Sequence, residues 1–198
     1  VVWSALSHSA ILDAHRQTHG VRVLPRYRFN KADVIISFDA DFLGTWISPV
    51  EFTRGYAEQR SLKGSPPRCS YHVQVESRLS LTGAKADTRI VIAPSERTAL
   101  IRELHSALTG ERAGPQMTGL ARRLREARGG SLVVCGSNDL HDQLLVNAIN
   151  QTLGNYGATI DLSTPSSQHQ SDDRAMQDLV EEMKEGNVGA LFIAGVNP

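Results

Sequence analysis

Residues 32–44 read ADVIISFDADFLG, an apolar run that ends abruptly in two aspartates, Asp39 and Asp41. The run VIISF at 34–38 is apolar at almost every position, which is typical of a parallel strand covered on both faces. In open α/β folds, ligands bind at the carboxyl ends of such strands. The role of the two acids at this strand end therefore decides the function.

Similar short runs, rich in β-branched residues, recur along the chain with helical stretches between them. They are VRVL (21–24), YHVQV (71–75), RIVI (89–92), SLVVC (131–135), ATIDL (158–162) and ALFIA (190–194). Strands and helices that alternate in this way predict an α/β fold with mainly parallel sheets flanked by helices.

Amphipathic periodicity predicts helices between these runs. The clearest are 139–153, 172–185 and the stretch between Pro94 and Gly110. Asp139 is a suitable N-cap for the first of them, and Gly154 follows its end. Ser171 is a candidate cap for the second.

The connector GERAGPQ at 110–116 divides the chain into an N-terminal α/β lobe, 1–112, and a C-terminal α/β lobe, 113–198. We expect both lobes to be Rossmann-like. The opening VVW resembles the end of a strand, and the chain stops directly after another. We therefore expect a fragment of a longer polypeptide.

The composition excludes several classes of function. The 198 residues include 21 basic and 21 acidic side chains, and this balance does not favour nucleic-acid binding. Two cysteines, Cys69 and Cys135, are too few for an iron-sulfur cluster or a structural zinc site, and a single disulfide is compatible but not implied. No apolar run is long enough to span a membrane, and the N-terminal residues do not resemble a signal peptide. We expect no direct membrane insertion.

Asp33, Asp39 and Asp41 are candidates for holding a hard cation, because carboxylates are the ligands that Mg²⁺ and Mn²⁺ prefer. The alternative is that they are solvated loop acids, with Asp33 turning the chain before the strand. The alternative is favoured, since no second group of ligands is identifiable.

Three further groups raise weaker hypotheses. His15 and His19 lie four residues apart, which is metal-ligand spacing, but no glutamate stands where a zinc hydrolase needs one, so a surface pair is favoured. Ser7, His8 and Ser9 are neighbours in sequence, whereas a nucleophile and its base usually meet through the fold.

Cys135 ends a buried strand and precedes Gly136, an arrangement that permits a nucleophile. No nucleophile-elbow motif surrounds it, so a small buried hydrophobe is the favoured interpretation. Gly154 and Gly157 fit a helix stop and a turn rather than a phosphate loop.

A longer stretch is more specific. Residues 75–100, VESRLSLTGAKADTRIVIAPSERTAL, resemble a segment of the molybdopterin oxidoreductases. The residues in register with that pattern are Arg78, Thr82, Ala86, Asp87, Ile92, Pro94, Ala99 and Leu100. Residues 178–198, DLVEEMKEGNVGALFIAGVNP, are similar to the family's helix, strand and G-x-N-P loop, which Gly195, Asn197 and Pro198 represent.

The resemblance implies paired lobes that cradle a molybdopterin guanine dinucleotide. Against that pattern, Asp39 replaces a loop glycine, Asp41 an asparagine and Phe42 a proline. Two carboxylates would face the diphosphate with like charge. In a second loop, Pro94-Ser95-Glu96-Arg97 stands where the family has P-G-T-D, so the acid that holds guanine is missing.

A chain of this kind without its cofactor loops resembles the large iron-sulfur subunit of alternative complex III, a bacterial quinol:cytochrome c oxidoreductase. KADVIISFDADFLG, FTRGYAEQR and AINQTLGNYGATI also look like that group. The resemblance implies a non-catalytic scaffold without cofactor or metal, on the periplasmic side of the inner membrane. Its partners would be other domains of its own polypeptide and the membrane and haem subunits of a respiratory complex.

Two alternatives stay open. One is a molybdopterin guanine dinucleotide-binding fragment of an active molybdenum oxidoreductase, anchored by the loop of Gly195, Asn197 and Pro198. The other is an unrelated small α/β enzyme that uses Cys135 or the aspartate pair.

Overall fold

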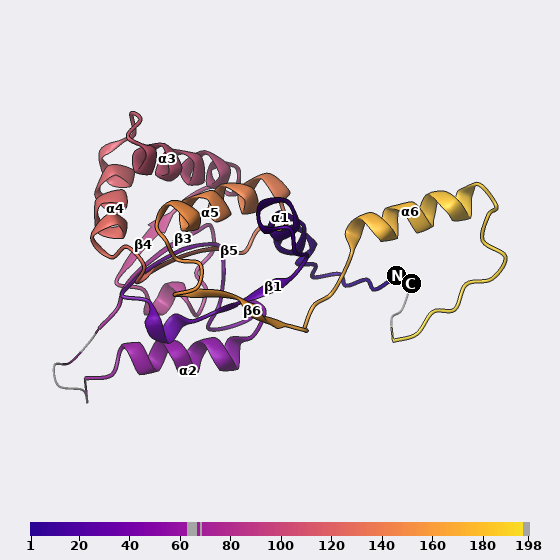
Figure 1. Cartoon of the computed structure of the whole chain (residues 1–198), viewed down its shortest axis with the longest axis horizontal. Helices are drawn as coiled ribbons and strands as arrows, with labels where there is room; N and C mark the ends of the chain where they lie inside the picture. Colours follow the sequence, from indigo (N-terminus) through magenta and orange to yellow (C-terminus); the bar gives the residue numbers. More distant parts are fainter. Residues whose placement is uncertain (63–66, 68, 196–198) are drawn as a thin grey trace.

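A computed structural model describes residues 1–62, 67 and 69–195 of the chain. A parallel sheet forms the middle layer, with helices on both of its faces (Figure 1). This arrangement confirms the predicted α/β class with a parallel sheet flanked by helices. Apolar strands that helices cover on both faces are the usual basis of such a sheet.

The central sheet has four parallel strands in the order β4-β3-β2-β5. Their bounds are β2 Val34–Phe38, β3 Tyr71–Glu76, β4 Thr88–Val91 and β5 Ser131–Cys135. The predicted strands at 34–38 and 131–135 are confirmed residue for residue, and those at 71–75 and 89–92 to within one residue at an end.

Five helices pack on the sheet. They are α1 Ser9–His19, α2 Pro49–Gln59, α3 Arg97–Thr109, α4 Pro115–Glu126 and α5 Leu140–Thr152. On one face, Ile36 of β2 lies in a core with Leu104 of α3 and Leu124 of α4. On the other face, Ile35 of β2 packs in a second core with Phe52 of α2. Successive side chains of β2 thus pack into opposite cores, because side chains alternate between the two faces of a strand.

The ends of two predicted helices agree with their capping chemistry. Asp139 caps α5 by accepting a hydrogen bond from the backbone N–H of Asp142. A short 3-10 turn, Pro94–Glu96, precedes α3, and Gly110 ends that helix with a positive φ of 88°. The predicted cap Ser171 is wrong by one residue, because the side chain of Asp172 accepts the capping bond at the start of α6, Asp173–Lys184.

The outer edge of β5 is closed by side chains rather than by another strand. The amide of Asn150, on α5, accepts a hydrogen bond from Val133 N at 3.1 Å and donates one to Val133 O at 2.8 Å. Gln143, also on α5, donates to Cys135 O at 3.0 Å. These bonds occupy backbone groups that a further strand would need, which protects the edge from unwanted pairing.

β5 comes from the predicted C-terminal lobe, yet it pairs with β2 of the predicted N-terminal lobe in one sheet. The proposed boundary at residues 112 and 113 lies in the connection between α3 and α4. The division into lobes stays a prediction.

A second, antiparallel pair joins β1, Leu24–Tyr27, to β6, Ile160–Ser166. The predicted strand at 21–24 is thus displaced by three residues, and the one at 158–162 by two at its start. The predicted strand at 190–194 is wrong for this structure, since those residues form no strand. Among the described residues, no helix is long and apolar enough to cross a bilayer.

Candidate functional site

The candidate site lies where β2 and β5 end side by side. From β2 the chain builds outward through β3 and β4, and then returns to place β5 on the opposite side of β2. This reversal makes the β2–β5 boundary the switch point of the sheet. Ligands of open α/β folds bind in the crevice outside the strand ends at such a point.

Asp39 follows β2 with a positive φ of 52°. This left-handed backbone favours glycine, and aspartate is among the few other residues that tolerate it. The Asp39 carboxylate accepts a hydrogen bond from the backbone N–H of Ser77 at 3.2 Å, through Oδ1. Oδ2 accepts one from Nη1 of Arg97 at 3.1 Å. Asp39 therefore links three parts of the strand-end surface.

Arg97, the first residue of α3, makes three contacts across the switch point. Besides Asp39, its Nε donates to Oδ2 of Asp142 at 3.0 Å and its Nη2 donates to Oγ of Ser137 at 3.0 Å. Ser137 lies in the loop after β5, and Asp142 is in the first turn of α5. We refer to Asp39, Arg97, Ser137 and Asp142 as the Arg97 clasp.

The Arg97 clasp joins one buried carboxylate to two half-buried charged side chains. Asp142 is fully buried, and its second oxygen, Oδ1, has no hydrogen-bond partner among the described residues. Burial lowers the pKa of Arg97, but the hydrogen bonds to Asp142 and Asp39 more than offset this, so its pKa is raised. Arg97 is therefore the group that compensates the buried carboxylate of Asp142.

The two strand-end loops also touch directly. A Cβ on Gly136 would lie 2.4 Å from the backbone oxygen of Asp39, so only glycine fits between the loops. The backbone N–H of Gly136 donates to Phe38 O at 2.8 Å. Backbone contact and the Arg97 clasp thus join the loops that follow β2 and β5.

Asp41 holds its own loop and the next one in place. Its Oδ1 accepts hydrogen bonds from the backbone N–H of Thr82 at 3.1 Å and from Thr82 Oγ1 at 2.9 Å. Gly44 packs so closely on this carboxylate that a Cβ would lie 2.2 Å from Oδ2. Asp41 is therefore a structural anchor between residues 39–46 and the turn near Thr82.

The hypothesis of a cation held by the three aspartates is wrong for this arrangement. Asp33 precedes β2, so the whole strand separates it from Asp39 and Asp41, and its Oδ1 accepts a bond from Gln59 at 2.7 Å. No group of three or more histidine, cysteine, aspartate or glutamate side chains suited to a metal occurs in the part of the chain that the structure describes.

The histidine pair is a packing feature. The rings of His15 and His19 stack with centroids 5.7 Å apart. Nδ1 of His15 contacts the backbone oxygen of Ile11 at 2.7 Å, and Nε2 contacts Oη of Tyr156 at 3.3 Å. Both ring nitrogens of His15 are thus engaged. Because His15 is buried, the expectation of a surface pair holds only for His19.

Ser7, His8 and Ser9 form no nucleophile and base pair with one another. Ser7 Oγ donates to Asp173 and Ser9 Oγ donates to Asp13. Burial, together with the nearby His169, lowers the pKa of His8 to about 4. Ser7 thus ties the N-terminal segment to the start of α6.

Cys135 matches the expectation of a small buried hydrophobe. It lies in the core, and burial raises the pKa of its thiol to about 12. The thiol therefore stays protonated at neutral pH and is a poor nucleophile. Cys69 is also a free thiol and is exposed, so the two cysteines form no disulfide. Gly154 and Gly157 both have positive φ, consistent with the predicted stop and turn.

Two hollows of the surface are large enough for a small ligand. One, of about 500 Å³, lies beside the Arg97 clasp and is lined by residues 3–8, Asp39, Asp41 and Asn138 among others. Its three aspartates are all engaged: Asp39 by Arg97, Asp41 by Thr82, and Asp173 by Ser7 and Asn138. The other, of about 680 Å³, lies between β1 and α2, away from the strand ends, and its charged side chains pair largely with one another.

The last candidate loop is only partly described. Gly195 is exposed, with a positive φ of 75°. Asn197 and Pro198 lie outside the described residues. Their predicted role as vestigial cofactor-binding residues stays a prediction, as does the predicted periplasmic location.

Comparison with known proteins identifies the fold but no family. No family model matches the sequence, and no curated protein matches it either. Among solved structures, a chain of the formyltransferase/hydrolase complex (FhcABCD) of Methylorubrum extorquens, in complex with methylofuran, is similar with a TM-score of 0.53 and 16% identity. The match covers 90% of this chain but 49% of that one, so this chain spans about half its length.

The predicted kinship with molybdopterin oxidoreductases is wrong, and so is the assignment to the iron-sulfur subunit of alternative complex III. No family model supports it, and the similar structure is a formyltransferase/hydrolase complex, which is a different family. The predicted function as a respiratory scaffold fragment is therefore wrong as well. The alternative of a molybdenum oxidoreductase fragment is no better supported. The matching stretch at 75–100 folds as the end of β3, a 3-10 turn at Gly83–Lys85, β4, the 3-10 turn at Pro94–Glu96 and the start of α3.

Sequence reasoning missed the Arg97 clasp. In the sequence, Asp39 stands where the family pattern has a loop glycine, and Arg97 stands in a second loop where the pattern ends in an aspartate. The available signal was that the two departures introduce opposite charges at neighbouring strand ends. Ser137 and Asp142 carry no local sequence signal, because only the fold brings them to Arg97.

Proposed function

We propose that this chain is a structural part of a subunit in a multi-subunit complex of the formyltransferase/hydrolase kind. Its α/β layer supports protein contacts, and its switch-point crevice receives no dinucleotide. The observation that carries this proposal is the Arg97 clasp, which occupies the place where an α/β sheet usually takes its ligand.

A ligand at this point would have to break internal bonds. A phosphate group would compete with Asp39 and Asp142 for Arg97, and it would leave the buried carboxylate of Asp142 without its counter-charge. Uncompensated buried charges are strongly unfavourable. The contact between Gly136 and Asp39 closes the gap between the two loops, and the hollow beside them presents three aspartates, which would repel a pyrophosphate.

The chemical groups near the crevice also favour a structural role. The Cys135 thiol is buried with a raised pKa, and the Asp41 carboxylate is bonded to Thr82. Within the described residues, no serine or cysteine forms a hydrogen bond with a histidine close to the strand ends. A nucleophile with an adjacent base, which covalent catalysis requires, is not assembled there.

The kind of complex is suggested by the similar solved structure. That chain belongs to a formyltransferase/hydrolase complex, and the likeness extends over 90% of the present chain. Partner subunits are therefore part of the proposal. The balanced charge of the chain supports protein partners over nucleic acid.

Isolation of the native assembly tests this proposal. The chain, tagged within its full-length gene product, would be purified from its source cells under mild conditions and sized by light scattering. We expect co-purification with other subunits in fixed ratio, and formyltransferase or hydrolase activity in the assembly. Arg97→Met should leave that activity per assembled complex unchanged. A full-length protein that purifies alone, or catalyses a reaction alone, would contradict the proposal.

A further inference from the structure

Residues 173–195 form an arm that stands apart from the α/β body (Figure 1). It consists of α6 and the segment that follows it, and no side chain of α6 is buried. We call residues 173–195 the docking arm. Its isolation is unusual, because a helix of this length gains most of its stability from packing an apolar face.

The docking arm carries apolar side chains that the described chain leaves partly or fully exposed. The apolar residues of α6 recur at helical spacing and form one stripe, which consists of Met176, Leu179, Val180 and Met183. Val180 is 37% exposed and Met183 is 46% exposed. The run after the helix is more open, with Phe192 at 94% exposure and Ile193 at 51%. Exposed apolar side chains that gather on one segment in this way mark an interaction site.

The run at 190–194, ALFIA, has the composition of a buried strand but no strand partner in the described structure. No backbone hydrogen bond joins it to another described segment. An apolar β-forming run with open backbone groups is suited to adding a strand to the edge of another sheet. The outer edge of β5 is not available for this purpose, because Asn150 occupies Val133.

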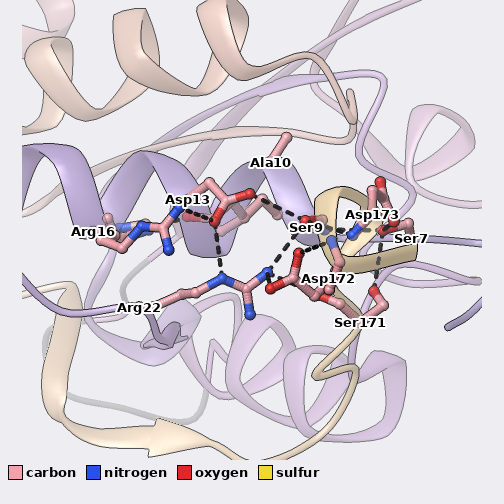
Figure 2. A network of polar contacts seen from close by, with 12 residues as sticks. Ser7, Ser9, Ala10, Asp13, Arg16, Arg22, Ser171, Asp172 and Asp173 are labelled. Atoms are coloured by element: carbon pink, nitrogen blue, oxygen red, sulfur yellow. Dashed lines mark hydrogen bonds and ion pairs between the residues drawn. The ribbon is translucent and has the colours of Figure 1, made fainter. Parts of the chain in front are cut away.

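The start of the docking arm is firmly held, which fixes the direction in which it projects. Arg22 donates to Asp13 at 2.8 Å and to the backbone oxygen of Ser171 at 3.0 Å, just before α6 (Figure 2). Asp173, in the first turn, accepts hydrogen bonds from Ser7 at 2.6 Å and from Asn138 Nδ2 at 2.8 Å.

Charge selects among the possible occupants of this surface. Residues 172–185 contain six acidic side chains and two basic ones, Arg174 and Lys184, whereas the whole chain is neutral. Two docking arms that packed against each other would bring like net charges together, which opposes association. A receiving surface with excess lysine and arginine around an apolar centre complements the arm.

We propose that the docking arm binds a partner subunit that offers a free strand edge to residues 190–194 and an apolar surface, rimmed by basic side chains, to α6. This proposal rests on the proposed function, since it requires a multi-subunit assembly. It assigns the contact within that assembly to the apolar stripe of α6 and to the apolar run at 190–194.

The test uses the full-length tagged protein isolated with its complex. Leu179→Asp and Phe192→Asp place a charge in the contact and should weaken retention of the partner about 30-fold, the loss typical of a central interface residue. Asp178→Glu and Glu181→Asp alter the opposite face of α6, keep the charge of the docking arm, and should retain the partner. Because none of these side chains is buried, all four variants should keep the wild-type unfolding midpoint.

A photo-cross-linking amino acid at position 192 identifies the occupant. We expect a cross-link to a different subunit, at or beside an edge strand. A cross-link within the same chain or to a second copy would overturn the proposal, and so would full partner retention by Leu179→Asp. If wild type and the variants all retain the partner subunits, only this inference fails. If wild type purifies alone, both this inference and the proposed function fail.

Discussion

Arg97 and Asp39 join two loops that lie far apart in the sequence: Nη1 of Arg97 donates to Oδ2 of Asp39 over 3.1 Å, across the carboxyl end of β2. The same guanidinium reaches Asp142 at the start of α5. One side chain therefore connects both sides of the switch point. Ligands of this kind of fold usually enter here, and in this chain the contact ties the strand-end loops together.

Removing the guanidinium should destabilise the protein strongly. Arg97→Met keeps the apolar stem but leaves Asp142 buried without a counter-charge, so we expect a loss of about 3 to 5 kcal/mol in the free energy of unfolding. Urea denaturation measures this. Arg102→Met is the matched control on α3, and because Arg102 is exposed and its bond to His141 is exposed too, its effect should stay within about 0.5 kcal/mol. Equal effects of the two variants would contradict the role of Arg97.

The backbone at Asp39 makes a separate prediction. Asp39→Ala and Asp39→Gly both remove the bond to Arg97, so their difference reports the positive φ of 52°. Alanine should be less stable than glycine by about 1 kcal/mol, because the left-handed conformation penalises a Cβ. Denaturation of the two variants side by side measures the difference. An alanine variant as stable as the glycine variant would show that this backbone conformation is absent in solution.

Close approach of the two loops predicts opposite effects for two glycine substitutions. Gly136→Ala would place a Cβ against the backbone of Asp39 and should cost about 1 to 3 kcal/mol. Gly119→Ala lies within α4 with no atom near the new Cβ, and should stabilise by about 0.5 to 1 kcal/mol. Thermal or urea unfolding distinguishes the two. A neutral Gly136→Ala would mean that the loops are apart.

Buried histidines predict a loss of stability in mild acid. Burial lowers the pKa of His15 and of His72 to about 4, whereas an unfolded histidine titrates near 6.5. The unfolded state therefore binds more protons below pH 6.5. Stability should be full above that pH and fall as the pH drops from about 6.5 to about 4.

Each such histidine contributes a slope of about 1.4 kcal/mol per pH unit inside this window. His72→Gln should reduce the slope of unfolding free energy against pH by about that amount. The carboxylates of Asp87 and Glu76 have lowered pKa values and therefore act in more acidic solution. An unchanged slope in His72→Gln would contradict a buried neutral His72.

Much of the fold could be predicted from the sequence where one local rule dominates. β2 and β5 are continuous apolar runs in a sheet covered on both faces, so their composition identifies them. The predicted position of β1 was wrong by three residues because pairing with β6 sets where this strand lies. β1 also includes Pro25 and the exposed Arg26, which do not fit the apolar pattern of a strand. The run at 190–194 has strand composition but lacks a partner strand among the described residues.

The candidate site was predicted only in its location. The position of Asp39 and Asp41 at a strand end follows from the apolar run before them. The contacts that decide their role come from Arg97, Thr82 and Asp142, which no spacing rule connects to residues 39–41. Long-range ion pairs of this kind depend on the sheet order and are not visible in one sequence.

Calorimetric titration of the purified protein with guanosine diphosphate tests the central claim most directly. If the Arg97 clasp closes the switch point, wild type should show no saturable binding at ligand concentrations up to the millimolar range. Saturable one-to-one binding that inorganic pyrophosphate competes away, and that Gly136→Ala abolishes, would place a nucleotide in the crevice and contradict the account.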